Sequence, residues 1–323
     1  MKFTSRVPVQ RDASLLLADY LTGRFTYHDR AGWMALISGG RLTIDGKNAT
    51  VNDTVRGGEI IAYDAGEFDE PSADLRYSVV YEDEWIIAVS KPGDLLVHRA
   101  GKSFRHNLMF QLRFNRTPPS PTARCIHRLD RHTSGVVLIA KTPEIQAEIS
   151  ALFETRQVGK NYIAYVHGIP NREDRIINKP IGKDPAATTR PKFRIDESGK
   201  EAISHIEQCT PIGTSFARLL ISPLTGRTHQ LRVHCASIGH PIVGDTLYGS
   251  DMRFPDDPFY KSAGAGQIGP SSRHALHCLR IRFFHPRLQR KCDIEAPLPL
   301  DMIRLEYFLI GKKKGPAAPF QHR

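Results

Sequence analysis

Nine residues, 127–135, bring together two arginines, two histidines and one carboxylate, and the apolar run 136–140 follows them. We expect that run to form a buried strand, with the polar residues at its mouth. In an extended chain Arg128 and Asp130 point to one side and Leu129 points to the other. A carboxylate surrounded by cations is favoured in its ionised form and is a candidate nucleophile. The composition also fits a second interpretation, in which Asp130 caps a turn among surface cations.

Two further segments carry side chains suited to the same site. Residues 160–168 alternate in polarity as a strand does, which places Tyr162 on one face among small residues. Residues 219–234 predict a strand, a turn and then a helix, with Arg227 directly after the turn. Taken singly, a core tyrosine and a surface arginine would explain these residues as well.

These three segments together resemble one enzyme family. His-Arg-Leu-Asp-x-x-Thr-Ser-Gly at 127–135 resembles the catalytic motif of the RluA-type pseudouridine synthases. Lys-x-Tyr-x-Ala-x-Val-x-Gly at 160–168 and the run Gly226–His234 resemble two further motifs of that family, in the same order. The resemblance covers residues 76–305 well, and it implies an α+β catalytic domain on a mixed, largely antiparallel sheet.

The resemblance also implies roles for individual residues. Asp130 would be the essential aspartate, acting covalently or as a base on the ribose, and Arg128 would enter the base stack vacated by a flipped uridine. Tyr162 would pack on the uracil and help to move a proton. Arg227 would pair with Asp130, since a nucleophilic carboxylate in a water-poor pocket needs a cation and arginine offers a rigid fork. RNA contact is further expected for His127 and Arg131.

Composition favours an anionic partner. The 323 residues include 45 Lys and Arg against 34 Asp and Glu, a formal charge of +11 with a pI near 9.5. Such an excess favours phosphate contacts and counterion release. Neither an apolar run long enough to cross a bilayer nor a signal peptide is evident, so we expect a cytoplasmic protein that does not bind membranes.

Cysteine and histidine usage gives little support to metal chemistry. The five cysteines are widely spaced without a C-x-x-C pair, which predicts reduced thiols, and the histidine spacing fits no standard zinc site. Gly264–Gly269 matches G-x-G-x-x-G, but no strand precedes it, so a dinucleotide site is not expected. The family resemblance implies neither a cofactor nor a metal.

The chain divides into five expected segments. They are a polar, loosely ordered N-terminal extension at 1–13, a domain at 14–64 whose stretches 39–47 and 55–61 resemble the S4 RNA-binding domain, a linker at 65–75, the pseudouridine synthase domain at 76–311, and a basic disordered tail at 312–323. The S4-like domain should hold two helices, one capped by Ser14 and broken by Gly23, the other capped by Asp29, followed by small strands.

Basic residues in the S4-like segment, including Arg41 and Lys47, are candidates for a phosphate-contacting face, and solvated charges on a small packing domain are the less favoured alternative.

In the catalytic domain we expect Ser103 to cap a helix, residues 143–156 to form an amphipathic helix, and residues 171–200 to be loop-rich.

The sequence therefore predicts an enzyme, an RNA pseudouridine synthase that isomerises specific uridines in structured RNA. Ribosomal RNA is favoured and transfer RNA is possible, and a monomer is the default. Two alternatives stay open: a non-catalytic S4-type RNA-binding or ribosome assembly factor, and a metal-dependent hydrolase that uses the histidines. Turnover assays and metal analysis respectively discriminate them.

Overall fold

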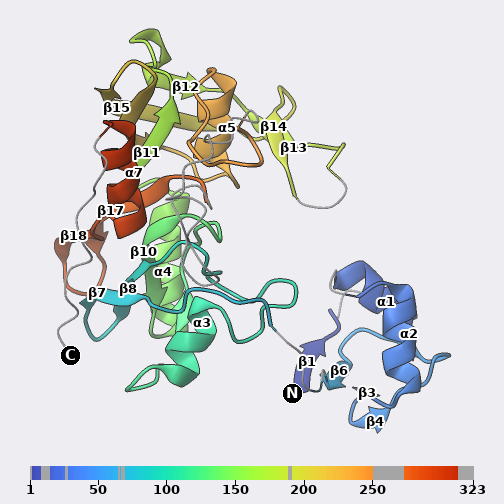
Figure 1. Cartoon of the computed structure of the whole chain (residues 1–323). Coiled ribbons are helices and arrows are strands. Elements are labelled where there is room, and N and C mark those ends of the chain that lie inside the picture. Colours follow the sequence, from blue (N-terminus) through green and yellow to red (C-terminus); the bar gives the residue numbers. More distant parts are fainter. Residues whose placement is uncertain are drawn as a thin grey trace. The chain divides into compact units, whose positions relative to one another are not determined.

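The computed structural model describes residues 2–8, 15–25, 28–64, 66, 70–187, 191–249 and 273–311. The chain forms two compact units, Met1–Pro71 with Arg99–Arg105, and Ser72–His98 with His106–Arg323 (Figure 1). Two segments discussed above, Gly264–Gly269 and the basic tail 312–323, lie outside the described residues, as does Ser14.

The smaller unit packs two helices on a small antiparallel sheet. Helix α1 is Leu17–Arg24 and α2 is Arg30–Ser38. The sheet has the order β1-β6-β3-β4, and a separate pair joins β2 to β5. The strands are β1 (Lys2–Arg6), β2 (Leu15–Leu16), β3 (Leu42–Ile44), β4 (Lys47–Asn48), β5 (Thr54–Val55) and β6 (Ile60–Asp64).

Local sequence explains most of this unit. The side chain of Asp29 accepts a hydrogen bond from the amide of Gly32 at 2.8 Å, which confirms the expected cap of α2. Trp33 on α2 is fully buried and packs edge-on against Tyr63 of β6, with ring centroids 5.4 Å apart. The expected break at Gly23 is wrong, because α1 continues through it to Arg24 and a single glycine lowers helix stability without forbidding it.

The N-terminal extension was expected to be loosely ordered, and that expectation is wrong for its first residues. Lys2–Arg6 form β1, which pairs antiparallel with β6. Five residues of mixed polarity are too few to show the alternation of apolar and polar side chains that marks a strand. This strand forms because β6 supplies its hydrogen-bond partners. The smaller unit also includes Arg99–Arg105, where the carboxylate of Glu70 accepts hydrogen bonds from the amides of Phe104 and Arg105.

The larger unit is built on a ten-stranded sheet. Its order is β12-β15-β16-β11-β17-β10-β8-β7, with β18 paired to β17 and β9 paired to β10. The strands are β7 (Ser78–Glu82), β8 (Ile86–Lys91), β9 (Arg124–Cys125), β10 (Ser134–Ala140), β11 (Gly159–His167), β12 (Ile176–Asn178), β15 (Ile203–Ile212), β16 (Phe216–Pro223), β17 (Leu276–His285) and β18 (Arg290–Glu295). Only the pair β10 and β17 is parallel among the strand pairs that the structure describes, which confirms the mixed, largely antiparallel sheet of an α+β fold.

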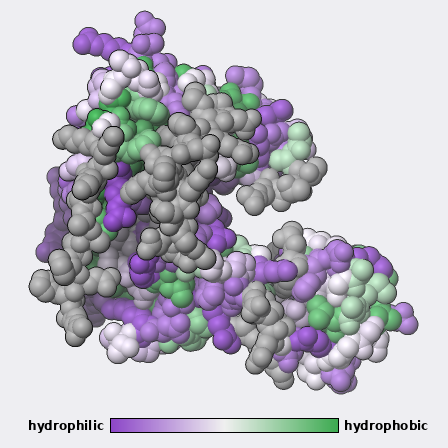
Figure 2. Space-filling view, in the orientation of Figure 1, coloured by the Kyte–Doolittle hydropathy of each residue, from purple (hydrophilic) through white to green (hydrophobic). Residues whose placement is uncertain are grey.

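Helices flank this sheet. They are α3 (Leu108–Phe110), α4 (Pro143–Glu154), α5 (Gln230–Ser237) and α7 (Leu300–Leu309). Helix α4 lies against β10, and Ile145 and Ile149 on its apolar face are buried, as its periodicity predicts (Figure 1). No helix in the described part of the chain is long and apolar enough to cross a membrane. Figure 2 shows hydrophilic residues spread over the visible faces, with apolar residues in small groups.

One local expectation for this unit is wrong: Asn107, and not Ser103, caps α3 by accepting a hydrogen bond from the amide of Phe110 at 3.0 Å. The segment 171–200 is loop-rich as expected, but within its described residues it also holds β12 and a two-stranded sheet of β13 (Ile181–Lys183) and β14 (Phe193–Ile195). Strands of three residues are too short for alternation to reveal them.

Gly135 allows β10 to approach β17 closely. Its φ is +113°, and a Cβ there would lie 2.2 Å from the carbonyl oxygen of Cys278. We expect Gly135→Ala to lower the free energy of unfolding by about 3 kcal/mol or more, from backbone strain and overpacking together. Gly213→Ala is the matched control, because Gly213 has φ +59° with open space around it, and should cost about 1 kcal/mol. Urea denaturation measures both, and equal losses would show that the approach to β17 is unimportant.

Candidate active site

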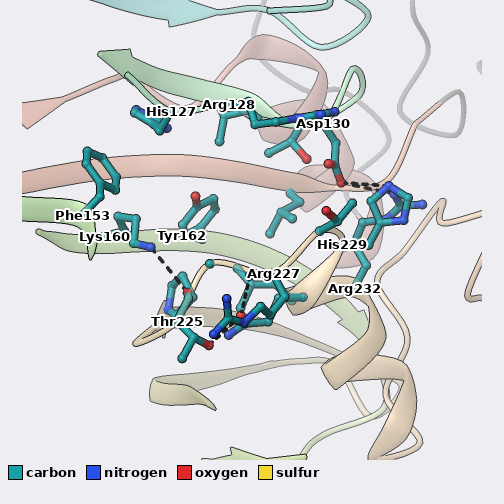
Figure 3. A pocket seen from close by; sticks show the side chains of 18 residues that line it. His127, Arg128, Asp130, Phe153, Lys160, Tyr162, Thr225, Arg227, His229 and Arg232 are labelled. Carbon is teal, nitrogen blue, oxygen red and sulfur yellow. Dashed lines mark hydrogen bonds and ion pairs between the residues drawn. The ribbon is translucent and has the colours of Figure 1, made fainter. Parts of the chain in front are cut away.

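A pocket of about 290 Å³ opens where the loop before β10 faces β11 and the start of α5 (Figure 3). Five of the residues singled out from the sequence line it: His127, Arg128, Asp130, Tyr162 and Arg227. Leu129, between Arg128 and Asp130, also lines the pocket, but it is only 6% exposed and belongs to the hydrophobic core. Arg131 is not among the lining residues, and Arg41 and Lys47 belong to the smaller unit.

The Asp130 carboxylate is held through one of its two oxygens. Its Oδ2 lies 3.3 Å from Nη1 of Arg232 and 3.7 Å from Nε2 of His229. Among the residues that the structure describes, none makes a hydrogen bond to Oδ1. The second oxygen therefore stays available to a bound molecule, while the first fixes the orientation of the side chain (Figure 3).

Arg232 is itself fixed by a buried ion pair. Its Nε and Nη2 donate to the two carboxylate oxygens of Asp245 at 2.7 and 2.9 Å, and the Asp245 side chain is fully buried. Burial disfavours the charged guanidinium, but the hydrogen bonds and charge of Asp245, with Asp130 beyond it, outweigh burial and raise the pKa of Arg232. The pair therefore presents a permanent cation to Asp130.

The expected pairing of Arg227 with Asp130 is not the one that the structure holds. Nε of Arg227 donates to the carbonyl of Glu201 at 2.8 Å, and its amide donates to Oε1 of Gln230. Arg227 lies in the turn before α5, whereas Arg232 lies inside that helix and is buried beside Leu231. The sequence did carry one signal for Arg232: it is a charged residue within a helix whose other residues are mostly buried, and such a residue needs a buried partner of opposite charge.

Tyr162 lies on β11 with its ring lining the pocket. Burial raises the pKa of its phenol well above the usual value, and contact with the Cys278 thiol adds to this effect. The phenol is therefore neutral at physiological pH. Lys160, two residues earlier, also lines the pocket, and its Nζ is 3.5 Å from the carbonyl of Thr225. Burial lowers the pKa of Lys160.

The basic residues around Asp130 differ in what they contact. Nε2 of His127 accepts a hydrogen bond from the amide of Leu138 at 3.0 Å, and the ring stacks on Phe153. Burial, with the charge of Lys160, lowers the pKa of His127 to about 3, so the ring is neutral. Arg131 is paired with Asp94 at 2.7 Å. By contrast, Arg128 is exposed at the pocket wall, and its guanidinium makes no hydrogen bond with any described residue.

Two buried basic side chains hold the loop that follows Asp130. Nζ of Lys91, 1% exposed, donates to the carbonyls of Pro92, Leu95 and Arg131 at 2.8, 2.8 and 3.0 Å. Nη1 of Arg273 donates to the carbonyl of His132 at 3.0 Å. These contacts fix the backbone that carries Asp130, and sequence reasoning did not find them. The described residues contain no cluster of three or more His, Cys, Asp or Glu suited to a metal ion.

Comparison with known proteins agrees with this architecture. A family model described as RNA pseudouridylate synthase matches residues 85–237. The chain is 33% identical to "Ribosomal large subunit pseudouridine synthase D" of Vibrio cholerae over 287 residues, 87% of each chain. It is 32% identical to the Pseudomonas aeruginosa protein of the same name over 286 residues, 87% of this chain and 88% of that one. The solved structure of human RNA Pseudouridylate Synthase Domain Containing 1 superposes with a TM-score of 0.55 at 29% identity, covering 72% of this chain and 87% of that chain.

Proposed function

This chain belongs to the RNA pseudouridine synthase family, and from that premise we propose that it isomerises uridine in ribosomal RNA with Asp130 as the reacting carboxylate. The observation that carries the proposal is the difference between the two oxygens of this carboxylate. Oδ2 is fixed by the Arg232–Asp245 ion pair, and Oδ1 is left to meet a nucleoside. A charged group held rigidly in this way needs no reorganisation when the substrate reacts.

The reaction moves one bond and one proton. The bond between N1 of uracil and C1′ of ribose breaks, the base turns, and a bond forms between C5 and C1′. The C5 proton leaves and N1 gains a proton, so that the product is an isomer of the substrate. Asp130 starts the sequence through Oδ1, either by attacking C1′ or by removing a proton from the ribose while the base detaches. A substrate deuterated at ribose C2′ separates these routes, because only proton removal gives a primary isotope effect.

The other pocket residues suit this chemistry. Tyr162 presents a flat, neutral ring on which a uracil can pack, and its raised pKa disfavours a phenolate in the free enzyme. Arg128 is exposed at the pocket wall, two residues from Asp130, where its guanidinium can stack in the gap left by a flipped nucleotide. We further propose RNA contact by Arg131, and a packing role for His127, whose ring nitrogen is already engaged.

Two considerations favour ribosomal RNA. The Vibrio cholerae and Pseudomonas aeruginosa relatives are both named ribosomal large subunit pseudouridine synthases. The smaller unit, with two helices and a small sheet, is in keeping with an S4-like module, in which Lys47 on β4 and Arg41 before β3 would contact phosphates. A cytoplasmic location would follow from such a substrate. Transfer RNA is the second candidate.

Tritium release tests the function directly. Ribosomal and transfer RNA transcripts carrying tritium at uridine C5 are incubated with the full-length protein, and label released to water is counted. Release from ribosomal RNA alone is the expected result. Release from transfer RNA alone would show that the substrate is transfer RNA and not ribosomal RNA. No release from either RNA, with tight binding to one, would instead favour a non-catalytic RNA-binding role.

Arg128→Ala should lower turnover about tenfold on a folded RNA and by less than threefold on a short unstructured strand holding the same uridine. Extruding a base from a stack costs a few kcal/mol, and the stacking guanidinium offsets part of that cost. An unstructured strand has little stacking to replace. Arg287→Ala is the matched control, since its guanidinium is engaged by Glu148 and does not line the pocket. Equal losses on both substrates for Arg128→Ala would contradict a role in flipping.

A further inference from the structure

His229 connects the Asp130 carboxylate to a hydrogen-bond chain that the proposed chemistry has not used. Its Nδ1 lies 2.8 Å from the hydroxyl of Tyr248, and that hydroxyl accepts a hydrogen bond from the amide of Phe193 at 2.9 Å. At the other side of the ring, Nε2 lies 3.7 Å from Oδ2 of Asp130. These contacts thus link β14, the turn after Asp245 and the start of α5 to the Asp130 carboxylate.

The available protons favour one direction for these hydrogen bonds. The Tyr248 oxygen already accepts from the Phe193 amide, and Nδ1 of His229 is the one acceptor within reach of its proton among the described residues. We therefore assign Tyr248 as the donor to Nδ1, which then carries no proton. In a neutral imidazole the proton then sits on Nε2, the nitrogen that faces Asp130.

The charge state agrees with this arrangement. Burial lowers the pKa of His229, and Arg232 and Arg128 lower it further, against the opposite effects of Asp130 and Asp245. Burial also raises the pKa of Tyr248 to about 12, so its hydroxyl keeps the proton that it donates. Protonating His229 would place the second proton of the ring on Nδ1 and leave the Tyr248 proton without its acceptor.

The backbone at His229 is held in an uncommon conformation. It precedes α5 with φ 58° and ψ 17°, in the left-handed region, and its side chain makes no capping hydrogen bond. Non-glycine residues there are strained by roughly 1–3 kcal/mol and gather at functional sites. Here the conformation places the ring between Tyr248 and Asp130, where Figure 3 shows His229 directed at the carboxylate.

We propose that His229 is a positioning residue for Asp130: it presents a neutral Nε2–H to Oδ2, and Tyr248 fixes the tautomer that makes this possible. The inference rests on the proposed role of Asp130. Arg232 and His229 then share Oδ2, one as a cation and one as a neutral donor, and together they direct Oδ1 at the ribose. The 3.7 Å distance shortens to a hydrogen bond when substrate fills the pocket, as catalytic contacts commonly do.

Two substitutions at His229 separate this role from a structural one. The amide nitrogen of Gln reaches the position of Nε2, whereas that of Asn reaches only the position of Nδ1. Asn is, however, the better residue for a left-handed position at a helix start. We expect His229→Gln to stay within about threefold of the wild-type single-turnover rate and His229→Asn to lose about tenfold, as for a lost hydrogen bond to a charged group. A merely structural role predicts the reverse order, which would overturn the proposal.

Nitrogen NMR of the full-length protein labelled with ¹⁵N-histidine tests the tautomer without any assay of turnover. The His229 resonance, assigned by its loss in His229→Gln, should report an unprotonated Nδ1 in the wild type. In Tyr248→Phe the Nε2–H bias should weaken and the pKa of His229 should rise, because the hydrogen bond to the neutral form is gone. A protonated Nδ1 in the wild type, or a tautomer unchanged in Tyr248→Phe, would overturn the inference. Tritium release by the wild type on ribosomal RNA is scored separately, so absent turnover with the expected tautomer would instead count against the proposed function.

Discussion

Asp130→Asn is expected to lower turnover at least about 10³-fold, roughly 4 kcal/mol of activation free energy, while RNA binding stays within about twofold. The amide has nearly the shape of the carboxylate, and its oxygen can still accept the hydrogen bond from Arg232. It is neither a nucleophile nor a base, so only the chemical step is removed. Single-turnover tritium release and filter binding on the same transcript measure the two effects.

Asp94→Asn is the matched control for this variant. Asp94 pairs with Arg131 in the neighbouring loop, is partly exposed, and has φ +69°, a conformation that Asn tolerates well. Partly exposed ion pairs contribute about 1 kcal/mol or less, so activity should change less than threefold. If Asp130→Asn lost binding and turnover to the same extent, Asp130 would be a structural residue and the proposed chemistry would have no reacting group.

Periodicity in the sequence predicts the elements around the site well. The apolar run 136–140 is β10, fully buried, and the alternation at 160–168 is β11, with Tyr162 on the face that lines the pocket. These segments are long enough for their pattern to reveal which face is buried. The three-residue strands of 171–200 are not, because they depend on partners that are distant in sequence.

The motifs bring Asp130, Tyr162 and Arg227 into one pocket, but they do not reveal how the carboxylate is held. Arg232 and Asp130 are 102 residues apart in the sequence. A motif shows which residues are close along the chain, but it does not show which of them pairs with a residue in another motif. The family resemblance implied Arg227 as the partner instead. In the structure the burial of Arg232 inside α5 decides the pairing, since a buried guanidinium must find carboxylates.

Arg232→Met should lower the free energy of unfolding by about 3–5 kcal/mol and turnover by at least about 10²-fold. Met fills much of the same volume, but it leaves the carboxylate of Asp245 buried without a cation, and breaking a buried ion pair costs this much. Arg227→Met is the matched control in the same motif. Its guanidinium contacts only the carbonyl of Glu201 among the described residues, so stability should change by about 1 kcal/mol. The opposite order would restore Arg227 as the structural partner.

The double variant Arg232→Met/Asp245→Asn separates stability from catalysis. Neutralising Asp245 removes the orphaned charge, and the Asn oxygen can still accept the hydrogen bonds that the amides of Leu247 and Tyr248 now make. Stability should therefore recover to within about 2 kcal/mol of the wild type. Turnover should stay low, because Asp130 still lacks the cation on Oδ2. Urea denaturation and single-turnover rates are measured on the same preparations. If stability and turnover both recovered, Arg232 would act on catalysis only by stabilising the fold.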